Sequence, residues 1–375
     1  MRVRIGAFNF VTLYRAGGVE PRPYGSSGDA VKICGIGGGK PLPYITTNHE
    51  AAKNLSYYFL LRIYICIGGD LTMLLEKTLF GAARQAAFLA RVRERFPFVY
   101  ARELTRSPGG RSVPVLQLGQ GRTKVLIVGG HHANESITSL LCWRLLEDYC
   151  AALEADGDFG GVRASRLYYN AVLYLVPLLN PDGASLVAGE LTPGGAEDAA
   201  ARSLAVQHPD IPFPLGWKAN LAGVDLNLNY PAGWQTAKRI KAEQGVRAPA
   251  PRDWGGRKPL DQPETAALAA YTCCVHPDLV IAYHTQGGEI YHGWHGFEPP
   301  GSARLAQAFA DASGYRVCAV PPQSDNAGFK DWFVSRFRRP GFTIEAGRGE
   351  NPLPESELPA LLQENAPIWA LAMLA

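Results

Sequence analysis

Residues 124–135 read KVLIVGGHHANE, and this stretch decides the fold. After the lysine, residues 125–128 form a continuous apolar run, which is typical of a strand covered on both faces by other elements. Gly129 and Gly130 break the run, and from Ser136 to Cys150 apolar residues recur at helical spacing. The stretch therefore predicts a buried strand, a break at the glycines and then a helix.

The same alternation of strands and helices continues along the chain. Residues 167–179 and 279–283 are two further apolar runs of the buried-strand type, and the first of them ends in NPDG, a strong turn signal. Strands that alternate with helices predict an α/β sheet with helices on both faces. The other predicted helices cover residues 74–96, 263–275, 303–313 and 355–374, and the other predicted strands cover residues 99–104, 113–118 and 342–344.

Side chains with metal-binding or acid–base chemistry follow three of these strands. His131, His132 and Glu135 come after the first strand, His284 follows the run LVIAY, and Glu345 ends the run FTI. In open α/β sheets, ligands bind beyond the carboxyl ends of the strands. Two imidazoles and a carboxylate with one open position are the ligand set of a catalytic zinc, and a further carboxylate can act as general base. The pattern predicts a metal on His132, Glu135 and His284, with Glu345 as the base.

Two adjacent histidines compete for the first ligand position. Glu135 stands three residues after His132, whereas Asn134, which binds zinc poorly, stands three residues after His131. His132 is therefore the preferred ligand. A His followed by Glu at this spacing is common by chance, so the prediction depends on the joint occurrence at three strand ends.

Composition and charge exclude several classes of protein. The chain has 375 residues, 47% of them apolar and 19% charged, as in a globular protein with a sizeable core. Its net charge of +3 gives no footprint for nucleic acid. The apolar residues 56–68 are fewer than the roughly 20 that a spanning helix needs, and Arg62 lies among them. Together with scattered cysteines that favour reduced thiols, these features predict a cytoplasmic protein that binds neither nucleic acid nor membrane.

Residues 1–72 differ from the rest of the chain. They show no sustained helical or strand period, and Met73 stands where the regular pattern begins. We interpret residues 1–72 as a leader, under the hypothesis that Met73 is the natural start. Residues 73–375 are then the catalytic domain.

Five motifs resemble, in order, the landmarks of the zinc carboxypeptidase family. The resemblance runs from about residue 97 to the C-terminus. HTQGGEIY, WKAN and NPLP resemble the bacterial γ-D-glutamyl-L-diamino acid (meso-diaminopimelate) peptidase branch in particular. The five motifs are HHANES at 131–136, NPDG at 180–183, GVDLNLNY at 223–230, AYHTQGGEIY at 282–291 and FTIEAG at 342–347.

The resemblance implies a role for each candidate residue. His132, Glu135 and His284 match the ligands of one zinc ion per chain, and Glu345 matches the catalytic glutamate. Lys218 falls where the family often has an arginine that stabilises the oxyanion, and a lysine can supply that charge as a point charge. The alternative for Lys218 is a solvated lysine in a loop.

Two positions depart from the pattern of the digestive carboxypeptidases. Asn227 matches a residue that binds the substrate carboxylate, but Leu228 replaces the arginine that clamps the terminal carboxylate. A leucine cannot make a bidentate guanidinium contact, so strict C-terminal exopeptidase specificity is not expected. The family's substrate-contacting tyrosine falls near Gln323.

Further cations stand where they can influence specificity. Lys330 falls where the family reads the substrate side chain, and a cation there favours a carboxylate such as that of diaminopimelate. The alternative is that Lys330 flanks a helix and points to water. Arg247 and Arg252 belong to a polar, proline-rich stretch that we expect to form a surface loop over the cleft.

The expected fold is a single α/β domain with a mixed, mostly parallel sheet flanked by helices on both faces. The expected function is zinc-dependent hydrolysis of an amide bond in peptidoglycan-derived peptides, with γ-D-glutamyl-meso-diaminopimelate as the leading substrate and cell-wall recycling as the role. One alternative is a zinc carboxypeptidase or N-acyl-amino-acid deacylase of the same architecture. A second is a non-catalytic peptide-binding member.

Overall fold

A computed structural model describes residues 79–322 and 324–375 in full and, before them, the backbone of five short strands. The chain divides into two compact units, Met1–Leu75 and Glu76–Ala375. The interpretation of residues 1–72 as a leader lies outside the described residues apart from these strands. They are an antiparallel pair, β1 (Arg2–Ile5) and β2 (Asn9–Thr12), and a three-stranded sheet of β3 (Tyr14–Arg15), β4 (Ala30–Lys32) and β5 (Ile45–Thr46).

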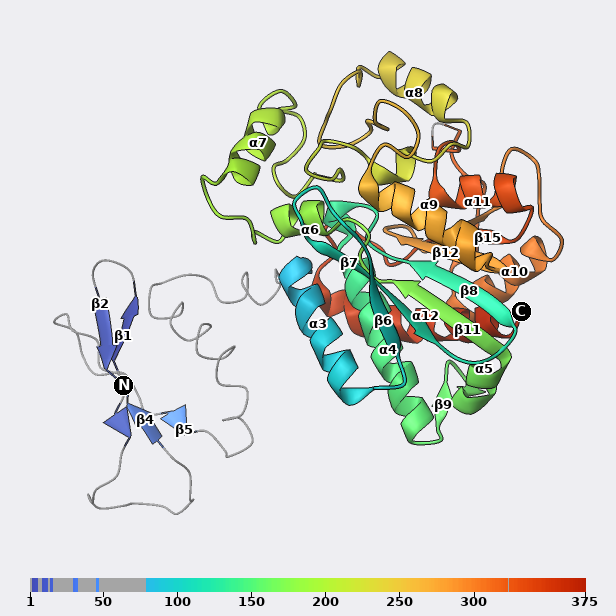
Figure 1. The fold of residues 1–375 in the computed structure, drawn as a ribbon, viewed down its shortest axis with the longest axis horizontal. Coiled ribbons are helices and arrows are strands. Elements are labelled where there is room, and N and C mark those ends of the chain that lie inside the picture. Colours follow the sequence, from blue (N-terminus) through green and yellow to red (C-terminus); the bar gives the residue numbers. More distant parts are fainter. Residues whose placement is uncertain are drawn as a thin grey trace. The chain divides into compact units, whose positions relative to one another are not determined.

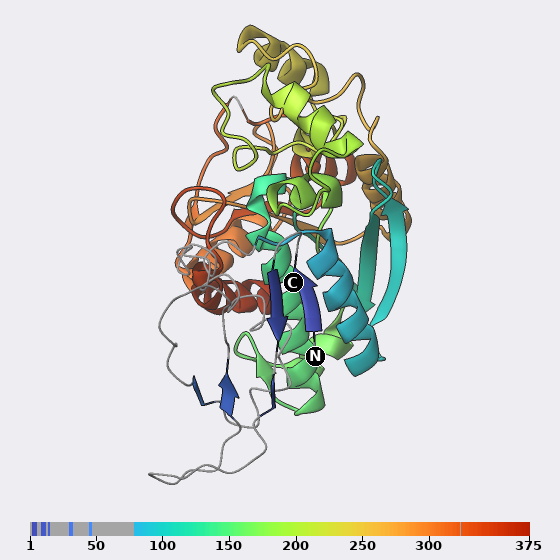
Figure 2. The same ribbon diagram turned by 90° about the vertical axis from the view of Figure 1, so that its left-hand side faces the viewer.

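The second unit is built on an eight-stranded sheet (Figure 1). Its strands are β6 (Tyr100–Arg106), β7 (Ser112–Leu118), β8 (Thr123–Val128), β11 (Ala171–Val176), β12 (Leu279–His284), β13 (Glu289–His292), β14 (Arg316–Val317) and β15 (Gly341–Glu345). Their order is β14-β13-β15-β12-β8-β11-β7-β6. The central strands β15, β12, β8 and β11 are parallel, whereas β13 and β7 add antiparallel on either side. Figure 2 shows β6 and β7 as a long pair at the edge. The predicted mixed, mostly parallel sheet is confirmed.

Helices cover both faces of this sheet. The helices are α3 (Ala82–Arg95), α4 (Ile137–Glu154), α5 (Ala164–Asn170), α6 (Pro181–Val187), α7 (Ala196–Ala205), α8 (Trp234–Glu243), α9 (Pro263–Val275), α10 (Ser302–Ser313), α11 (Phe329–Phe337) and α12 (Leu358–Met373). Shorter elements are the 3₁₀ turns η2 (Ala133–Glu135), η3 (Leu226–Leu228) and η4 (Glu355–Glu357) and the pair β9 (Asp158–Phe159) and β10 (Val162–Arg163).

Side chains along β8 alternate between two hydrophobic clusters. Val125 and Ile127 pack with α4, α10 and α12, whereas Leu126 and Val128 pack with α9 and α11 on the opposite face (Figure 1). Full burial of each such side chain stabilises the fold by about 1.5–3 kcal/mol. The continuous apolar run is therefore explained by a strand that has no solvent face.

One predicted strand was too long at its start. Residues 167–170 end helix α5, and the strand begins only at Ala171. Leu167 is buried and Tyr169 is 71% exposed, although residues two apart share a face in a strand. A short apolar run does not by itself distinguish helix from strand.

Helices α6, α7, α8 and α11 were not predicted, and the predicted helix 74–96 begins at Ala82 within the described residues.

Two simple expectations concern thiols and membranes. The cysteines in the described part of the chain are free thiols. Among the same residues, no helix is both long and apolar enough to cross a bilayer.

Candidate metal centre

The turn after β8 brings the first two candidate ligands to the edge of the sheet. Gly130 has a φ of 63°, and a Cβ there would lie 2.5 Å from Ser139 Oγ, so the turn requires glycine. His132 is extended at the start of η2, and Glu135 is the last residue of that turn. Helix α4 then begins at Ile137. His132 and Glu135 therefore project from a rigid strand–turn–helix junction.

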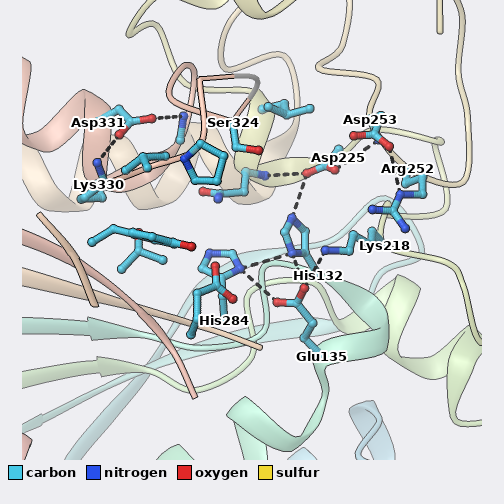
Figure 3. A pocket seen from close by; sticks show the side chains of 18 of the residues that line it. His132, Glu135, Lys218, Asp225, Arg252, Asp253, His284, Ser324, Lys330 and Asp331 are labelled. Atoms are coloured by element: carbon cyan, nitrogen blue, oxygen red, sulfur yellow. Dashed lines mark hydrogen bonds and ion pairs between the residues drawn. The ribbon is translucent and has the colours of Figure 1, made fainter. Parts of the chain in front are cut away.

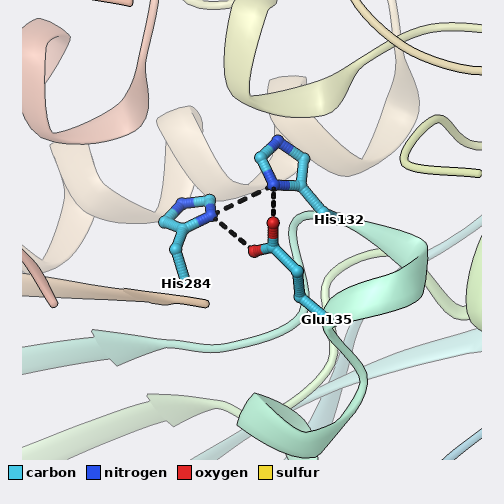
Figure 4. Close-up of side chains that lie close together, drawn as sticks. All are labelled: His132, Glu135 and His284. Carbon is cyan, nitrogen blue, oxygen red and sulfur yellow. Dashed lines mark hydrogen bonds and ion pairs between the residues drawn. The ribbon is translucent and has the colours of Figure 1, made fainter. Parts of the chain in front are cut away.

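Three side chains converge at one point (Figure 4). His132 Nδ1 lies 2.9 Å from Glu135 Oε1, and His284 Nδ1, from the end of β12, lies 3.0 Å from Glu135 Oε2. The two Nδ1 atoms are 3.2 Å apart. Within the described residues, these three form the one group of His, Cys, Asp or Glu whose ligand atoms all lie within 4.8 Å of one another. The structure thus brings together the three residues predicted to bind metal.

The donor set fits a zinc-like cation. His132 Nε2 lies 3.1 Å from Asp225 Oδ1, and an ionised carboxylate only accepts hydrogen bonds. The proton of the neutral imidazole is therefore on Nε2, which leaves the Nδ1 lone pair facing Glu135 and His284. A cation between the two facing Nδ1 atoms would accept the lone pairs of both rings. Two imidazoles and a carboxylate on one side of a point are a typical three-residue zinc set.

The charges around His132 favour a cation at this point. Burial alone would lower the pKa of His132, but the carboxylates of Glu135 and Asp225 raise it to about 9. Burial alone would raise the pKa of Glu135, yet His132 and Lys218 hold it well below its ordinary value. The carboxylates are thus anionic, and they attract a proton or a metal ion to the same place.

Lys218 is held beside the centre by its backbone and its ammonium. Its carbonyl accepts hydrogen bonds from Ala133 N (3.0 Å) and from Asn180 Nδ2 (3.3 Å). Asn180 Nδ2 also lies 3.2 Å from the carbonyl of His131, so the NPDG motif ties the two loops together. The Lys218 ammonium donates to Glu135 Oε1 at 2.8 Å. The structure therefore places Lys218 at the site, and the alternative of a solvated loop lysine is wrong.

Glu345 ends β15 directly beside the end of β12. In the parallel register it is the partner of His284, and its side chain lines the same pocket. Burial and the nearby Glu135 carboxylate raise the pKa of Glu345 to about 8. A cation at the centre would oppose this shift, because it favours the charged carboxylate.

The three converging side chains open into a pocket of about 400 Å³, a size that accommodates a small peptide (Figure 3). Asn227 and Leu228 both line it. Asn227 Oδ1 accepts a hydrogen bond from Phe329 N at 3.1 Å, which leaves its Nδ2 group as a donor. Leu228 contributes an apolar side chain to the pocket. Gln323 lies outside the described residues.

Lys330 lines the pocket but is already bound. Its side chain is nearly buried, and its Nζ donates to the carbonyl of Gly293 at 2.8 Å and lies 2.5 Å from Asp331 Oδ1. The alternative in which Lys330 points to water is therefore wrong. Its ammonium lies against the pocket with one carboxylate partner.

His131 does not belong to the converging group, although its ring centroid lies 5.4 Å from that of His284. It is fully buried, its Nε2 lies 3.2 Å from the hydroxyl of Tyr230, and its ring packs near Phe329. Burial lowers the pKa of His131 well below its ordinary value. The choice of His132 over His131 agrees with this geometry.

Sequence reasoning did not assign Asp225, Arg252 or Asp253 to the site. Asp225 stands in the motif GVDLNLNY, two residues before Asn227, and an acidic residue inside a recognised motif was an available signal. Asp253 N donates to Asp225 Oδ2 at 3.2 Å, and Arg252 Nε donates to Asp253 Oδ2 at 2.9 Å. Nothing in the polar stretch around Arg252 marks these contacts.

We predict that Asp225→Asn weakens zinc binding by about 10- to 100-fold, because a carboxylate that orients a ligating histidine and raises its basicity typically has this effect. The measurement is a zinc titration against a competing chelator. Asp261→Asn is the matched control, since Asp261 binds Arg257 N and Asn229 Nδ2 instead of a candidate ligand. Equal zinc affinity in wild type and Asp225→Asn would contradict the orienting role.

The chain matches a known protein family and two proteins of similar sequence. The profile of the zinc carboxypeptidase family matches residues 86–368. The gamma-D-glutamyl-L-diamino acid endopeptidase 1 of Lysinibacillus sphaericus is 38% identical over 278 residues, which are 74% of this chain and 67% of that protein. YqgT of Bacillus subtilis (strain 168), an uncharacterized protein, is 38% identical over 261 residues, which are 69% and 68% of the two chains.

Among solved structures, bovine thrombin-activatable fibrinolysis inhibitor, in complex with tick carboxypeptidase inhibitor, has a similar fold. It superposes with a TM-score of 0.59 at 17% identity and covers 80% of this chain and 96% of its own. At this identity the likeness is one of fold. It agrees with the eight-stranded sheet and its two layers of helices.

Proposed function

The chain belongs to the zinc carboxypeptidase family and is a zinc metallopeptidase, and we propose that it cleaves the amide bond between γ-D-glutamate and a diamino acid. The leading substrate is a peptidoglycan-derived peptide in which that diamino acid is meso-diaminopimelate. Support comes from a relative, 38% identical, that is named as a gamma-D-glutamyl-L-diamino acid endopeptidase.

The observation that carries the proposal is the pattern of charge in the pocket. Leu228 offers no clamp for a terminal carboxylate, whereas the ammonium of Lys330 lies at the pocket wall. A substrate that fits this pattern carries a carboxylate on its side chain, as diaminopimelate does. A peptidase built for ordinary C-terminal residues would be expected to have a guanidinium at position 228.

The proposed mechanism assigns one task to each polar side chain. When bound on His132, Glu135 and His284, zinc supplies a Lewis acid that activates water near neutral pH. Glu345 accepts a proton from the attacking water at its carboxylate and delivers it to the leaving nitrogen. A carboxylate in this position can carry out both transfers, because it accepts a proton in one step and releases it in the next.

Lys218 is proposed to stabilise negative charge on the carbonyl oxygen. Its ammonium lies 2.8 Å from Glu135 Oε1 and therefore beside the reacting centre. The Nδ2 group of Asn227 can donate to a substrate carboxylate, since its oxygen is engaged by Phe329 N. The Lys218 ammonium and the Asn227 Nδ2 group are thus both held in place before the substrate reacts.

The proposal is tested with L-Ala-γ-D-Glu-meso-diaminopimelate and with the same peptide joined through the α-carboxyl of glutamate. The proposed function predicts release of diaminopimelate from the γ-linked peptide and much slower release from the α-linked one, measured by mass spectrometry. Cleavage of the α-linked peptide alone would contradict the proposal and favour an ordinary peptidase.

We predict that Lys330→Met reduces the preference for diaminopimelate over lysine peptides by about 10- to 100-fold, because a charge-assisted hydrogen bond is lost. The measurement is the ratio of kcat/KM for the two peptides. Loss of the partner of Asp331 can reduce the amount of folded enzyme, but that affects both peptides equally and cancels in the ratio. An unchanged ratio would reject the role of Lys330 in the pocket.

A further inference from the structure

A short segment outside the sheet is attached directly to the metal centre. Asp253 N donates to Asp225 Oδ2, and Asp225 Oδ1 lies 3.1 Å from His132 Nε2. Arg252, the preceding residue, therefore stands two hydrogen-bonded contacts away from a candidate metal ligand. Arg252 and Asp253 both line the pocket.

The carboxylate of Asp253 lies between two cations. Asp253 binds two cations: Lys241 Nζ lies 2.7 Å from Oδ1, and Arg252 Nε lies 2.9 Å from Oδ2. The other two cations that line the pocket have a carboxylate each, since Lys218 pairs with Glu135 and Lys330 with Asp331. The group of Lys241, Arg252 and Asp253 thus contains two cations and one carboxylate, and the carboxylates of Asp225 and Glu345 also line the pocket.

The positive charge of Arg252 is presented in a form that suits a carboxylate. Arg252 uses Nε to bind Asp253, and among the described residues no protein partner occupies its two Nη groups. Its side chain is 41% exposed and lines the pocket. A guanidinium binds a carboxylate through two parallel N–H···O bonds, which an ammonium cannot reproduce.

The position of Arg252 assigns it to one side of the scissile bond. Arg252 and Lys330 lie at opposite ends of the pocket, with His132 between them (Figure 3). Lys218 lines the pocket on the same side of His132 as Arg252 (Figure 3). If Lys330 receives the diamino acid, a substrate that spans the centre places its acyl side at Arg252.

We infer that Arg252 binds the free α-carboxylate of the glutamyl residue on the acyl side of the cleaved bond. The inference rests on the proposed function. A γ-linked glutamate carries this carboxylate next to the reacting chain, and an α-linked residue does not. Arg252 is then a specificity residue that distinguishes γ-linked from α-linked peptides.

The test compares two substrates that differ only in this carboxylate. One is L-Ala-γ-D-Glu-meso-diaminopimelate, and the other carries an α-carboxamide on its γ-linked glutamate. The expected result is that Arg252→Met lowers kcat/KM for the carboxylate substrate by about 10- to 100-fold and changes the carboxamide substrate little. Arg252→Lys should retain more activity than Arg252→Met but less than wild type, because an ammonium keeps the positive charge without the two parallel N–H groups of a guanidinium.

Arg247→Met is the matched control. Arg247 is exposed in the same stretch and binds the carbonyl of Ala242, and it does not line the pocket. Equal losses on both substrates, or a loss of bound zinc, would overturn the inference by showing that Arg252 acts through Asp253 on the metal centre. Unchanged kinetics on the carboxylate substrate would overturn it while leaving the proposed function intact. If the wild type cleaves neither substrate, both proposals fail.

Discussion

Glu345→Gln is expected to lower kcat by about two to four orders of magnitude, the range typical of losing a general acid–base group. The amide keeps the size of the side chain but cannot accept a proton from water. Glu345 stands beside His284 in the register and lines the pocket, and no hydrogen bond ties it to the metal-binding side chains. The variant should therefore retain its zinc and its fold, and substrate binding should change less than kcat.

The control for Glu345 lies on the neighbouring strand. Glu289 is opposite Glu345 in the antiparallel register of β13 and β15, and its carboxylate binds Arg316 and the hydroxyl of Tyr291. Glu289→Gln should leave kcat within a few-fold of wild type. A Glu345→Gln variant that contains zinc and keeps wild-type kcat would show that another group moves the proton.

Replacement of His132 by Ala is expected to remove stoichiometric zinc and with it essentially all activity. His132 contributes one of three converging ligand atoms, and the carboxylates of Glu135 and Asp225 surround it. Loss of a ligand should exceed the about 10- to 100-fold effect of losing a residue that merely orients one. The measurement is zinc content of the purified variant by elemental analysis, together with its activity.

His131→Ala is the informative comparison, because the two histidines are adjacent in sequence. His131 is buried against Tyr230 and Phe329, so its removal should reduce thermal stability while zinc content stays near that of wild type. If His131→Ala loses zinc and His132→Ala keeps it, the assignment of the ligand is wrong.

The spacing of apolar residues predicted those strands and helices whose side chains are apolar simply because they are buried. The apolar run of β8 and the helix that follows the glycines are present, because a strand covered on both faces needs apolar residues at every position. Residues 167–170 were assigned to a strand although they end helix α5, because a pattern of apolar and polar residues over only four positions fits both the helical and the strand period. Helix α11 was missed, because its first residues are buried polar and aromatic side chains that carry no simple helical stripe.

Some residues of the candidate site could be predicted from the sequence and others could not. The positions of His132, His284 and Glu345 follow from the rule that strands deliver ligands at their carboxyl ends, so they were accessible from sequence. Asp225 and Arg252 belong to irregular segments, and their place depends on hydrogen bonds between residues far apart in the chain, such as the 93-residue separation of His132 and Asp225. No local pattern encodes such contacts.

The most direct test of the central claim is metal-dependent cleavage of L-Ala-γ-D-Glu-meso-diaminopimelate. The purified protein is stripped with a chelator, assayed, and assayed again after stepwise addition of zinc. We predict no release of diaminopimelate from the stripped protein and full recovery near one zinc per chain. Undiminished cleavage by metal-free protein, or no cleavage of this peptide by protein that holds one zinc per chain, would contradict the assignment.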